Sequence, residues 1–260
     1  MRIGVIGFGN FGQFLAKAFI KHNHQVFATS RTDYSHVAAT LGVWFSTSVE
    51  EFCRQGLECV MLSPSILSLE KVMKSLPLSL LLESSASSFP NPVLFVDVLS
   101  VKVYPKELLS AMLPADRADL LCTHPMFGPQ SGRDSWNGLP MVFERVRISY
   151  PPLCDAFLRI FEGEGCKMVP MTCEEHDRFA ASSQFITHTV GRMLSQLHLE
   201  STPINTKGYE LLLQVSRNTV ADSFDLYYGL YKFNDQAIEQ LERLEVALKE
   251  VKEKLLSFKG

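Results

Sequence analysis

The stretch Gly7-Phe8-Gly9-Asn10-Phe11-Gly12 decides the fold, because it links an apolar, strand-like run at 2–6 to a helix-like run at 11–21. In a G-x-G-x-x-G turn the first glycine permits a tight bend, the second lets a pyrophosphate approach the backbone, and the third lets helix and strand pack closely. The phosphates lie at the helix N-terminus, where free N–H groups and the helix dipole favour negative charge. A strand on either side of the motif distinguishes such a site from a chance glycine-rich turn. All six residues are therefore predicted to bind a dinucleotide cofactor.

The end of the second strand-like run favours NADP over NAD. Enzymes that use NAD usually place Asp or Glu there to bind the ribose 2′-hydroxyl, whereas this chain has Thr29-Ser30-Arg31-Thr32. A carboxylate would repel a 2′-phosphate, while Ser30 can donate a hydrogen bond to it and Arg31 can pair with it. The alternative is that Arg31 is only a solvated surface charge.

Strand-like and helix-like runs alternate over the first 150 residues, which predicts an α/β, Rossmann-type doubly wound parallel sheet for a cofactor domain at 1–150. The expected strands are 2–6, 25–29, 57–62, 93–98 and 120–123. The expected helices are 11–21, 48–54, 65–75 and 105–113, and the serine-rich stretch 83–91 is predicted to be a surface loop.

The pattern changes after residue 150, and a helical substrate and dimerisation domain is predicted at 151–260. A last strand near 166–171 would complete the sheet, and helices are expected at 174–197, 206–215 and 222–256. Apolar residues recur at three- and four-residue steps in the last helix, at Leu241, Leu244, Leu248, Val251 and Leu255. Such a stripe packs against something, and a twofold partner can bury it, so we expect a homodimer.

Composition excludes several classes of protein. Of 260 residues 46% are hydrophobic and 20% charged, with a formal net charge of -3, which is typical of a soluble globular protein and argues against nucleic acid or an anionic membrane as partner. The six cysteines lack C-x-x-C spacing, which predicts buried, reduced thiols in a reducing compartment. Because the first strand begins at residue 2, the chain as it reads is expected in the cytoplasm unless a leader has been removed.

Ligands of doubly wound sheets bind beyond the carboxyl ends of the strands, where His124 and Ser100 are expected. His124 leaves an apolar run into a turn rich in Pro and Gly. An imidazole can take a hydroxyl proton while hydride leaves the same carbon, and Ser100 could hold the imidazole or the hydroxyl. From spacing alone, a structural histidine that caps the turn remains an alternative. The histidines lack the spacing of metal ligands, so no metal is predicted.

Four stretches together resemble the TyrA family of prephenate and arogenate dehydrogenases, most closely its plant arogenate branch: Gly7–Gly12, Asp97–Lys102, His124–Pro129 and Ser183–Thr189. The resemblance extends over essentially the whole chain. It implies oxidative decarboxylation of arogenate to tyrosine, with His124 acting on the C4 hydroxyl as hydride passes to NADP. Plant relatives are commonly plastid enzymes, so a plastid location would follow if a transit peptide has been removed.

The resemblance also implies the substrate site. Gln184 and His188 are four residues apart and share one helix face. The resemblance also suggests that Lys207, beside Thr206 at a helix start, faces the substrate. Gln130 and Ser131 are predicted to reach the substrate because they lie just past the turn that carries His124. Asp222 corresponds to the acidic residue that favours the ammonium of arogenate over the keto acid of prephenate. An N-cap of the last long helix is the competing role for Asp222.

Other functions stay open on the sequence. Prephenate, giving 4-hydroxyphenylpyruvate, is the alternative substrate. The β-hydroxyacid dehydrogenases and pyrroline-carboxylate reductases also join a Rossmann domain to a helical one. The former depend on a lysine in the helical domain, which Lys207 could supply, but His124 with Ser100 argues against that function. A non-catalytic NADP-binding redox sensor would keep the glycine turn but would not need His124 and Ser100.

Overall fold

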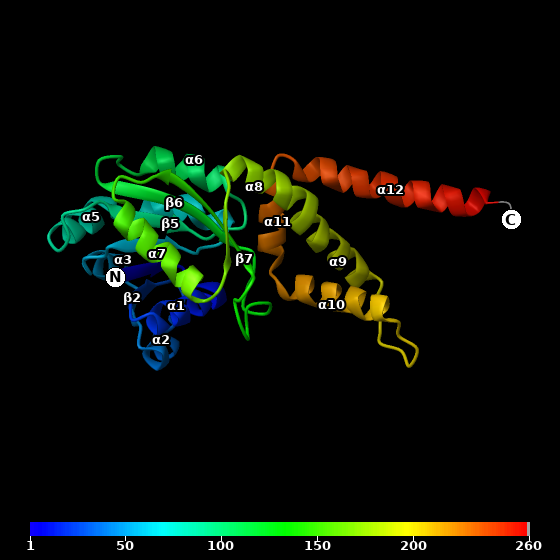
Figure 1. Cartoon of the computed structure of the whole chain (residues 1–260), viewed down its shortest axis with the longest axis horizontal. Coiled ribbons are helices and arrows are strands. Elements are labelled where there is room, and N and C mark those ends of the chain that lie inside the picture. Colours follow the sequence, from blue (N-terminus) through cyan, green and yellow to red (C-terminus); the bar gives the residue numbers. More distant parts are fainter. Residues whose placement is uncertain (259–260) are drawn as a thin grey trace. The chain divides into compact units, whose positions relative to one another are not determined.

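The computed structural model describes residues 1–258, and the chain divides into two compact units, Met1–Cys173 and Glu174–Gly260 (Figure 1). Within the described residues the first unit holds an eight-stranded sheet in the order β3-β2-β1-β4-β5-β6-β7-β8. Neighbouring strands are parallel except β6 and β7. The bounds are β1 Arg2–Ile6, β2 Gln25–Thr29, β3 Trp44–Ser46, β4 Cys59–Leu62, β5 Val93–Asp97, β6 Ala118–Pro125, β7 Pro140–Arg147 and β8 Lys167–Pro170.

The Rossmann-type fold class is thus confirmed, with two strands that the sequence did not indicate. β3 has only three residues. β7 mixes apolar and charged side chains, and its charged groups find partners in its surroundings: Glu144 pairs with Lys106, and Arg145 pairs with Asp155. β7 is only partly buried, so it lacks the continuous burial of strands β4 to β6 that made those strands recognisable in the sequence.

Helices flank the sheet: α1 Asn10–Lys21, α2 Ser35–Leu41, α3 Val49–Cys53, α4 Leu69–Ser75, α5 Leu78–Ala86, α6 Val103–Met112 and α7 Pro151–Gly163, with a 3-10 turn η1 at Ile66–Ser68. The predicted surface loop at 83–91 was wrong at its start, because α5 continues to Ala86. The first part of the serine-rich stretch is helical because α5 has a buried face, which is formed by Leu81, Leu82 and Ser85.

The boundary between the two units lies at 173/174 rather than at 150/151. The segment that was expected to open the helical domain forms α7 and β8 of the first unit. Phe157 and Phe161 of α7 are fully buried, and they pack on Phe19 of α1 and on Trp136. Strand β8 pairs with β7, close to the strand predicted at 166–171.

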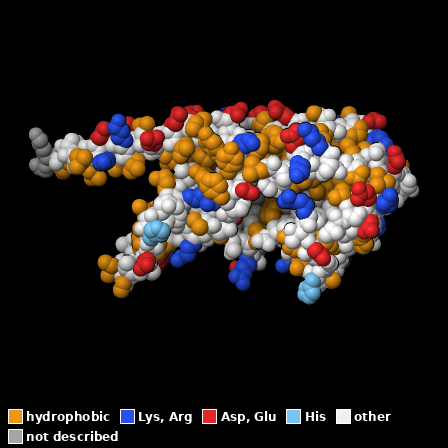
Figure 2. Space-filling model, turned by 180° about the vertical axis from the view of Figure 1, so that it is seen from behind, with side chains coloured by type: hydrophobic (Ala, Val, Ile, Leu, Met, Phe, Trp, Pro, Cys, Tyr) orange, Lys and Arg blue, Asp and Glu red, His pale blue; other side chains and the backbone are white. Residues whose placement is uncertain are grey.

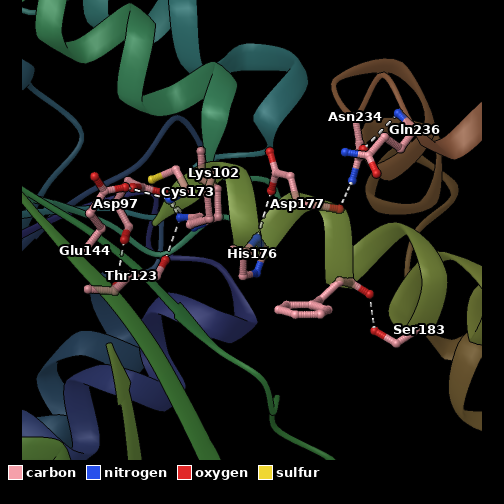
Figure 3. Close-up of polar contacts among 12 residues, drawn as sticks. Asp97, Lys102, Thr123, Glu144, Cys173, His176, Asp177, Ser183, Asn234 and Gln236 are labelled. Carbon is pink, nitrogen blue, oxygen red and sulfur yellow. Dashed lines mark hydrogen bonds and ion pairs between the residues drawn. The ribbon is translucent and has the colours of Figure 1, made fainter. Parts of the chain in front are cut away.

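The second unit is helical: α8 Cys173–Ala180, the π-helical turn η2 Ala181–Phe185, α9 Ile186–Gln196, α10 Lys207–Ala221, α11 Phe224–Lys232 and α12 Ala237–Ser257. The helix predicted at 222–256 is divided, since a turn around Asn234 separates α11 from α12. The buried Asn234 side chain donates to the Asp177 carbonyl at 2.7 Å, which ties this turn to α8 (Figure 3). Helices α9 and α10 approach closely at Gly191, where an added Cβ would collide with Thr219.

Across residues 1–258, none of the helices combines the length and the apolar content needed to cross a membrane.

Candidate active site

The glycine turn between β1 and α1 has the geometry of a phosphate cradle. Gly7 has φ +96°, and a Cβ there would lie 2.5 Å from the Ser63 carbonyl oxygen, so only glycine fits. A Cβ on Gly12 would collide with the Gly7 carbonyl, so glycine at this position permits the close approach of helix and strand. At Gly9, which caps α1, a Cβ would meet no atom within 4 Å. The helix N-terminus has no side-chain cap, so its free N–H groups can bind an anion.

The remaining residues of the turn differ in where their side chains lie. Phe8 is fully buried and packs on Tyr34 and Phe45, so its side chain belongs to the core and only its backbone can face a cofactor. Asn10 is exposed. Phe11 is half-buried and stacks on Phe14 at a ring separation of 6.1 Å.

The end of β2 presents Ser30 half-buried and Arg31 exposed. Thr29, the last residue of β2, is buried with its hydroxyl oxygen lacking a partner among the described residues. The first carboxylate after the strand, Asp33, accepts from the Ser35 backbone at 2.8 Å. Hydrogen bonds from Ser35 hold the pKa of Asp33 below its usual value. Ser30 and Arg31 are thus the side chains at this strand end that could donate to a phosphate, while Asp33 is hydrogen-bonded to Ser35.

His124 and Ser100 lie at the carboxyl ends of neighbouring parallel strands. The backbone register pairs Asp97 of β5 with Cys122 of β6, so His124 is two residues and Ser100 three residues beyond that pair. His124 is only 4% exposed, while Ser100 is half-buried in the loop after β5. The structure therefore brings both to the same edge of the sheet, next to the glycine-turn end of β1 and β4.

A buried ion pair between Asp97 and Lys102 joins these strand ends (Figure 3). Lys102 is 1% exposed and also donates to the Thr123 carbonyl at 2.5 Å, while the Thr123 hydroxyl donates to the Asp97 carbonyl at 2.7 Å. Burial raises the pKa of Asp97 although the Lys102 ammonium beside it acts in the opposite direction. The pair closes the short loop that contains Ser100 and holds it to the residue before His124.

The loop after β6 carries Gln130 and Ser131. Ser131 accepts a hydrogen bond from the Gly128 backbone at 3.1 Å, which gives its hydroxyl a structural role in the turn, and Gln130 is exposed. A cleft of about 490 Å³ lies between this loop and α1, with Asn10, Gln13 and Trp136 among its lining residues. Neither His124 nor Ser100 lines that cleft.

The helical unit gathers Gln184, His188 and Asp222. His188 is 7% exposed, and its Nε2 lies 3.8 Å from an Asp222 carboxylate oxygen. Burial lowers the pKa of His188, and Asp222 partly offsets this. The Gln184 Oε1 and the His188 Nδ1 are buried without a partner among the described residues. Unpaired polar atoms of this kind are expected where a ligand completes the hydrogen bonding.

Asp222 does not cap the following helix. The N-cap of α11 is Ser223, whose hydroxyl accepts from the Leu226 backbone at 3.2 Å. The competing role for Asp222 is therefore wrong, and its carboxylate is left for other partners.

Thr206 and Lys207 lie at the opposite end of α10 from Asp222. Thr206 caps α10 by accepting from the Tyr209 backbone at 3.2 Å, and Lys207 pairs with Glu210. Since α10 has 15 residues, its ends are about 22 Å apart. The structure thus does not bring these two residues to Asp222 within one chain.

Two plant proteins align with nearly the whole chain. The chain is 52% identical over 98% of its length to the protein named arogenate dehydrogenase 2, chloroplastic, of Arabidopsis thaliana, of which it spans 70%. It is 53% identical to arogenate dehydrogenase 1, chloroplastic, of the same plant and spans 39% of that longer protein. The chain belongs to the TyrA family of arogenate and prephenate dehydrogenases. It is therefore an oxidoreductase, and the predicted resemblance is confirmed.

Two sequence profiles match parts of this TyrA-family chain: "NADP oxidoreductase coenzyme F420-dependent" at residues 2–85 and "TYRAAT1-like, C-terminal domain" at residues 193–259. A solved prephenate dehydrogenase from A. aeolicus, in complex with hydroxyphenyl propionate and NAD+, superposes with a TM-score of 0.76 at 18% identity. The alignment covers 98% of this chain and 91% of that one. This likeness establishes the shared fold.

Sequence reasoning missed two charged residues of the TyrA-family chain, one in each unit, that contact predicted site residues or their immediate neighbours. Lys102 was read only as part of a motif, and its burial follows from the pairing of β5 with β6. Arg192 was not singled out, although it lies four residues after His188 and so on the same helix face. That spacing was the available signal.

Proposed function

We propose that this protein is an NADP-dependent arogenate dehydrogenase, which oxidises and decarboxylates arogenate to tyrosine. The observation that carries the proposal is the 52% identity, over 98% of the chain, with a relative named arogenate dehydrogenase. The arrangement of His124, Ser100 and the glycine turn at one edge of the sheet supports a hydride transfer there.

In this mechanism His124 takes or polarises the proton of the substrate's C4 hydroxyl, and Ser100 hydrogen-bonds that hydroxyl and orients it. The glycine turn, with Ser30 and Arg31, would hold NADP, which would supply the acceptor for the hydride from C4. Carbon dioxide then leaves C1 and the ring becomes aromatic, which makes the reaction effectively irreversible. Because aromatisation supplies the driving force, the protein mainly has to position the reacting groups and polarise the hydroxyl. The burial of His124 supports this role, since excluding water strengthens such polar interactions.

The choice of NADP rests on Ser30, which stands where NAD enzymes usually place an acid, and on Arg31, which can pair with a 2′-phosphate. The choice of arogenate rests on Asp222, whose carboxylate stands beside His188 and is not used as a helix cap. An ammonium is attracted to such a carboxylate, and the keto acid of prephenate is not.

The test is steady-state kinetics with arogenate and prephenate, each against NADP and NAD, following the absorbance of the reduced nicotinamide. We expect the highest kcat/KM for arogenate with NADP. Faster turnover of prephenate would overturn the substrate assignment, and preference for NAD would overturn the cofactor assignment. Cofactor binding without turnover of either substrate would identify a sensor.

We further propose a homodimer formed through the helical unit. Figure 2 shows hydrophobic side chains along α12, and the exposed ones include Leu248, Val251 and Leu255. A second copy could bury them, and it could also bring its own Thr206–Lys207 end toward a substrate bound near Asp222. The named relatives are chloroplastic, and we propose a plastid location, which imaging of the full gene product in plant cells would test.

A further inference from the structure

The proposed specificity residue, Asp222, lies in a two-residue linker between two helices. Asp222 and Ser223 join α10 to α11, and both have extended backbones, with ψ of 145° and 152°. Neither residue is held by the repeating hydrogen bonds of a helix interior. The direction of the Asp222 side chain therefore depends on what fixes this linker.

Arg192 of α9 contacts the linker directly. Its Nη2 donates to the Asp222 carbonyl at 2.8 Å and to the Ser223 carbonyl at 3.2 Å. The guanidinium also lies over two rings of α11, 5.6 Å from the centre of Phe224 and 5.1 Å from that of Tyr227. One cation thus binds the linker's backbone and the first turn of the next helix.

His188 and Arg192 are four residues apart on α9, so they project from the same face. The linker bound by Arg192 is the one whose Asp222 carboxylate approaches His188 at 3.8 Å. The Arg192 contacts fix the Asp222 peptide relative to the helix that carries His188.

The way in which Arg192 binds preserves the charge of Asp222. Within residues 1–258 no ion pair joins Arg192 to the Asp222 carboxylate, because the guanidinium donates to backbone carbonyls instead. The carboxylate is therefore not paired with Arg192 and remains available to a ligand. About half of the Asp222 side chain is exposed, so a ligand can reach it.

We propose that Arg192 is a positioning residue that holds the Asp222 carboxylate beside His188 and so sets the preference for an ammonium-bearing substrate over the corresponding keto acid. This inference rests on the proposed function. Arg192 itself does not need to touch the substrate.

A double-mutant cycle tests it. Arg192→Met removes the donors and the charge but keeps the aliphatic stem, and Arg192→Lys restores a cation that can donate to the carbonyls. We expect Arg192→Met to lower the arogenate-to-prephenate ratio of kcat/KM by about tenfold, mainly through a higher KM for arogenate. Arg192→Lys should recover part of the ratio. In an Asp222→Asn background, Arg192→Met should leave the ratio nearly unchanged, because both changes act through the same carboxylate.

The matched control is Arg178→Met, which also removes an arginine lying over an aromatic ring, that of Phe179, but at an exposed position without contact to the linker. It should leave the ratio as in the unmodified protein. If Asp222→Asn shifts the ratio while Arg192→Met does not, or if Arg192→Met shifts it equally in both backgrounds, the positioning role is wrong. If the unmodified protein does not prefer arogenate, or Asp222→Asn has no effect, the proposed function itself fails.

Discussion

The Lys102 ammonium is bound between the Asp97 carboxylate and the Thr123 carbonyl, in a position where both charged side chains are fully buried. The ion pair spans the loop that carries Ser100 and reaches the residue that precedes His124. The two proposed catalytic residues are thus attached to one buried polar cluster at the ends of β5 and β6.

Removing either partner should destabilise the first unit strongly. Lys102→Met leaves the Asp97 carboxyl group buried without its cation, and breaking a buried pair in this way costs about 3–5 kcal/mol. Urea unfolding checks this value, and Asp97→Asn should give a loss of similar size. Combining the two substitutions should cost less than the sum of the single losses, because the second removes a group that is already unpaired.

Lys74→Met is the matched control for Lys102→Met. Lys74 pairs with Glu70 on the surface of α4, where both side chains are at least half exposed. Exposed pairs contribute little, so the control should unfold at nearly the same urea concentration as the unmodified protein. Equal, small effects at both lysines would show that the buried pair does not support this edge of the sheet.

Arg31→Gln should impair the use of NADP and spare the use of NAD. The substitution removes the charge that we assign to the 2′-phosphate but keeps a hydrogen-bonding side chain. We expect KM for NADP to rise about tenfold, which is the size of one lost charge-assisted hydrogen bond. Initial rates at varied cofactor concentration measure it, with the exposed Arg54→Gln as the control variant. An equal rise in KM for NADP and for NAD would mean that Arg31 does not bind the 2′-phosphate.

Local sequence patterns were sufficient to predict the central strands of the first unit and its glycine turn. The glycine turn, β1, β2 and β4 to β6 follow from runs of apolar residues and from a motif whose residues are neighbours in the chain. The edge of the sheet that carries Ser100 and His124 follows from topology, since the carboxyl ends of parallel strands meet there.

Contacts between distant residues were not available to such patterns. Lys102 resembles any charged residue until β5 and β6 are paired, and then it is buried. The partners of Arg192 are carbonyls about thirty residues away, which have no sequence signature. The length of α10 separates Thr206 and Lys207 from Asp222, although all three were predicted for one substrate site.

The helical unit should lose stability in mild acid because of His188. Burial lowers the pKa of His188 below 6.5, so in the folded protein it stays neutral at a pH where the unfolded chain is already protonated. The unfolded state then binds more protons, and stability falls as the pH drops below the unfolded value. His188→Gln removes this contribution. We expect its unfolding free energy to decrease less than that of the unmodified protein between about pH 7.5 and about pH 5.5.

His24 provides the internal comparison for that measurement. Burial lowers its pKa to about 4, so it also disfavours the folded state in acid, and it is present in both proteins. The difference between the two pH profiles therefore reports on His188. Identical profiles would mean that His188 takes up its proton at the same pH in the folded and unfolded states.

Leu248→Glu on α12 should dissociate the proposed dimer without unfolding the chain. Leu248 is 61% exposed in the single chain, so a carboxylate there meets water and costs the monomer little, whereas in a buried apolar interface it would be strongly unfavourable. Sedimentation should show a shift from dimer to monomer, and the exposed Lys249→Gln, which lowers the net charge by the same one unit, is the control. The same variant should reduce kcat/KM for arogenate if the Thr206–Lys207 end of a second copy completes the site, because within one chain that end is about 22 Å from Asp222. A monomeric variant with full activity would exclude that contribution, and an unmodified protein that sediments as a monomer would exclude the dimer.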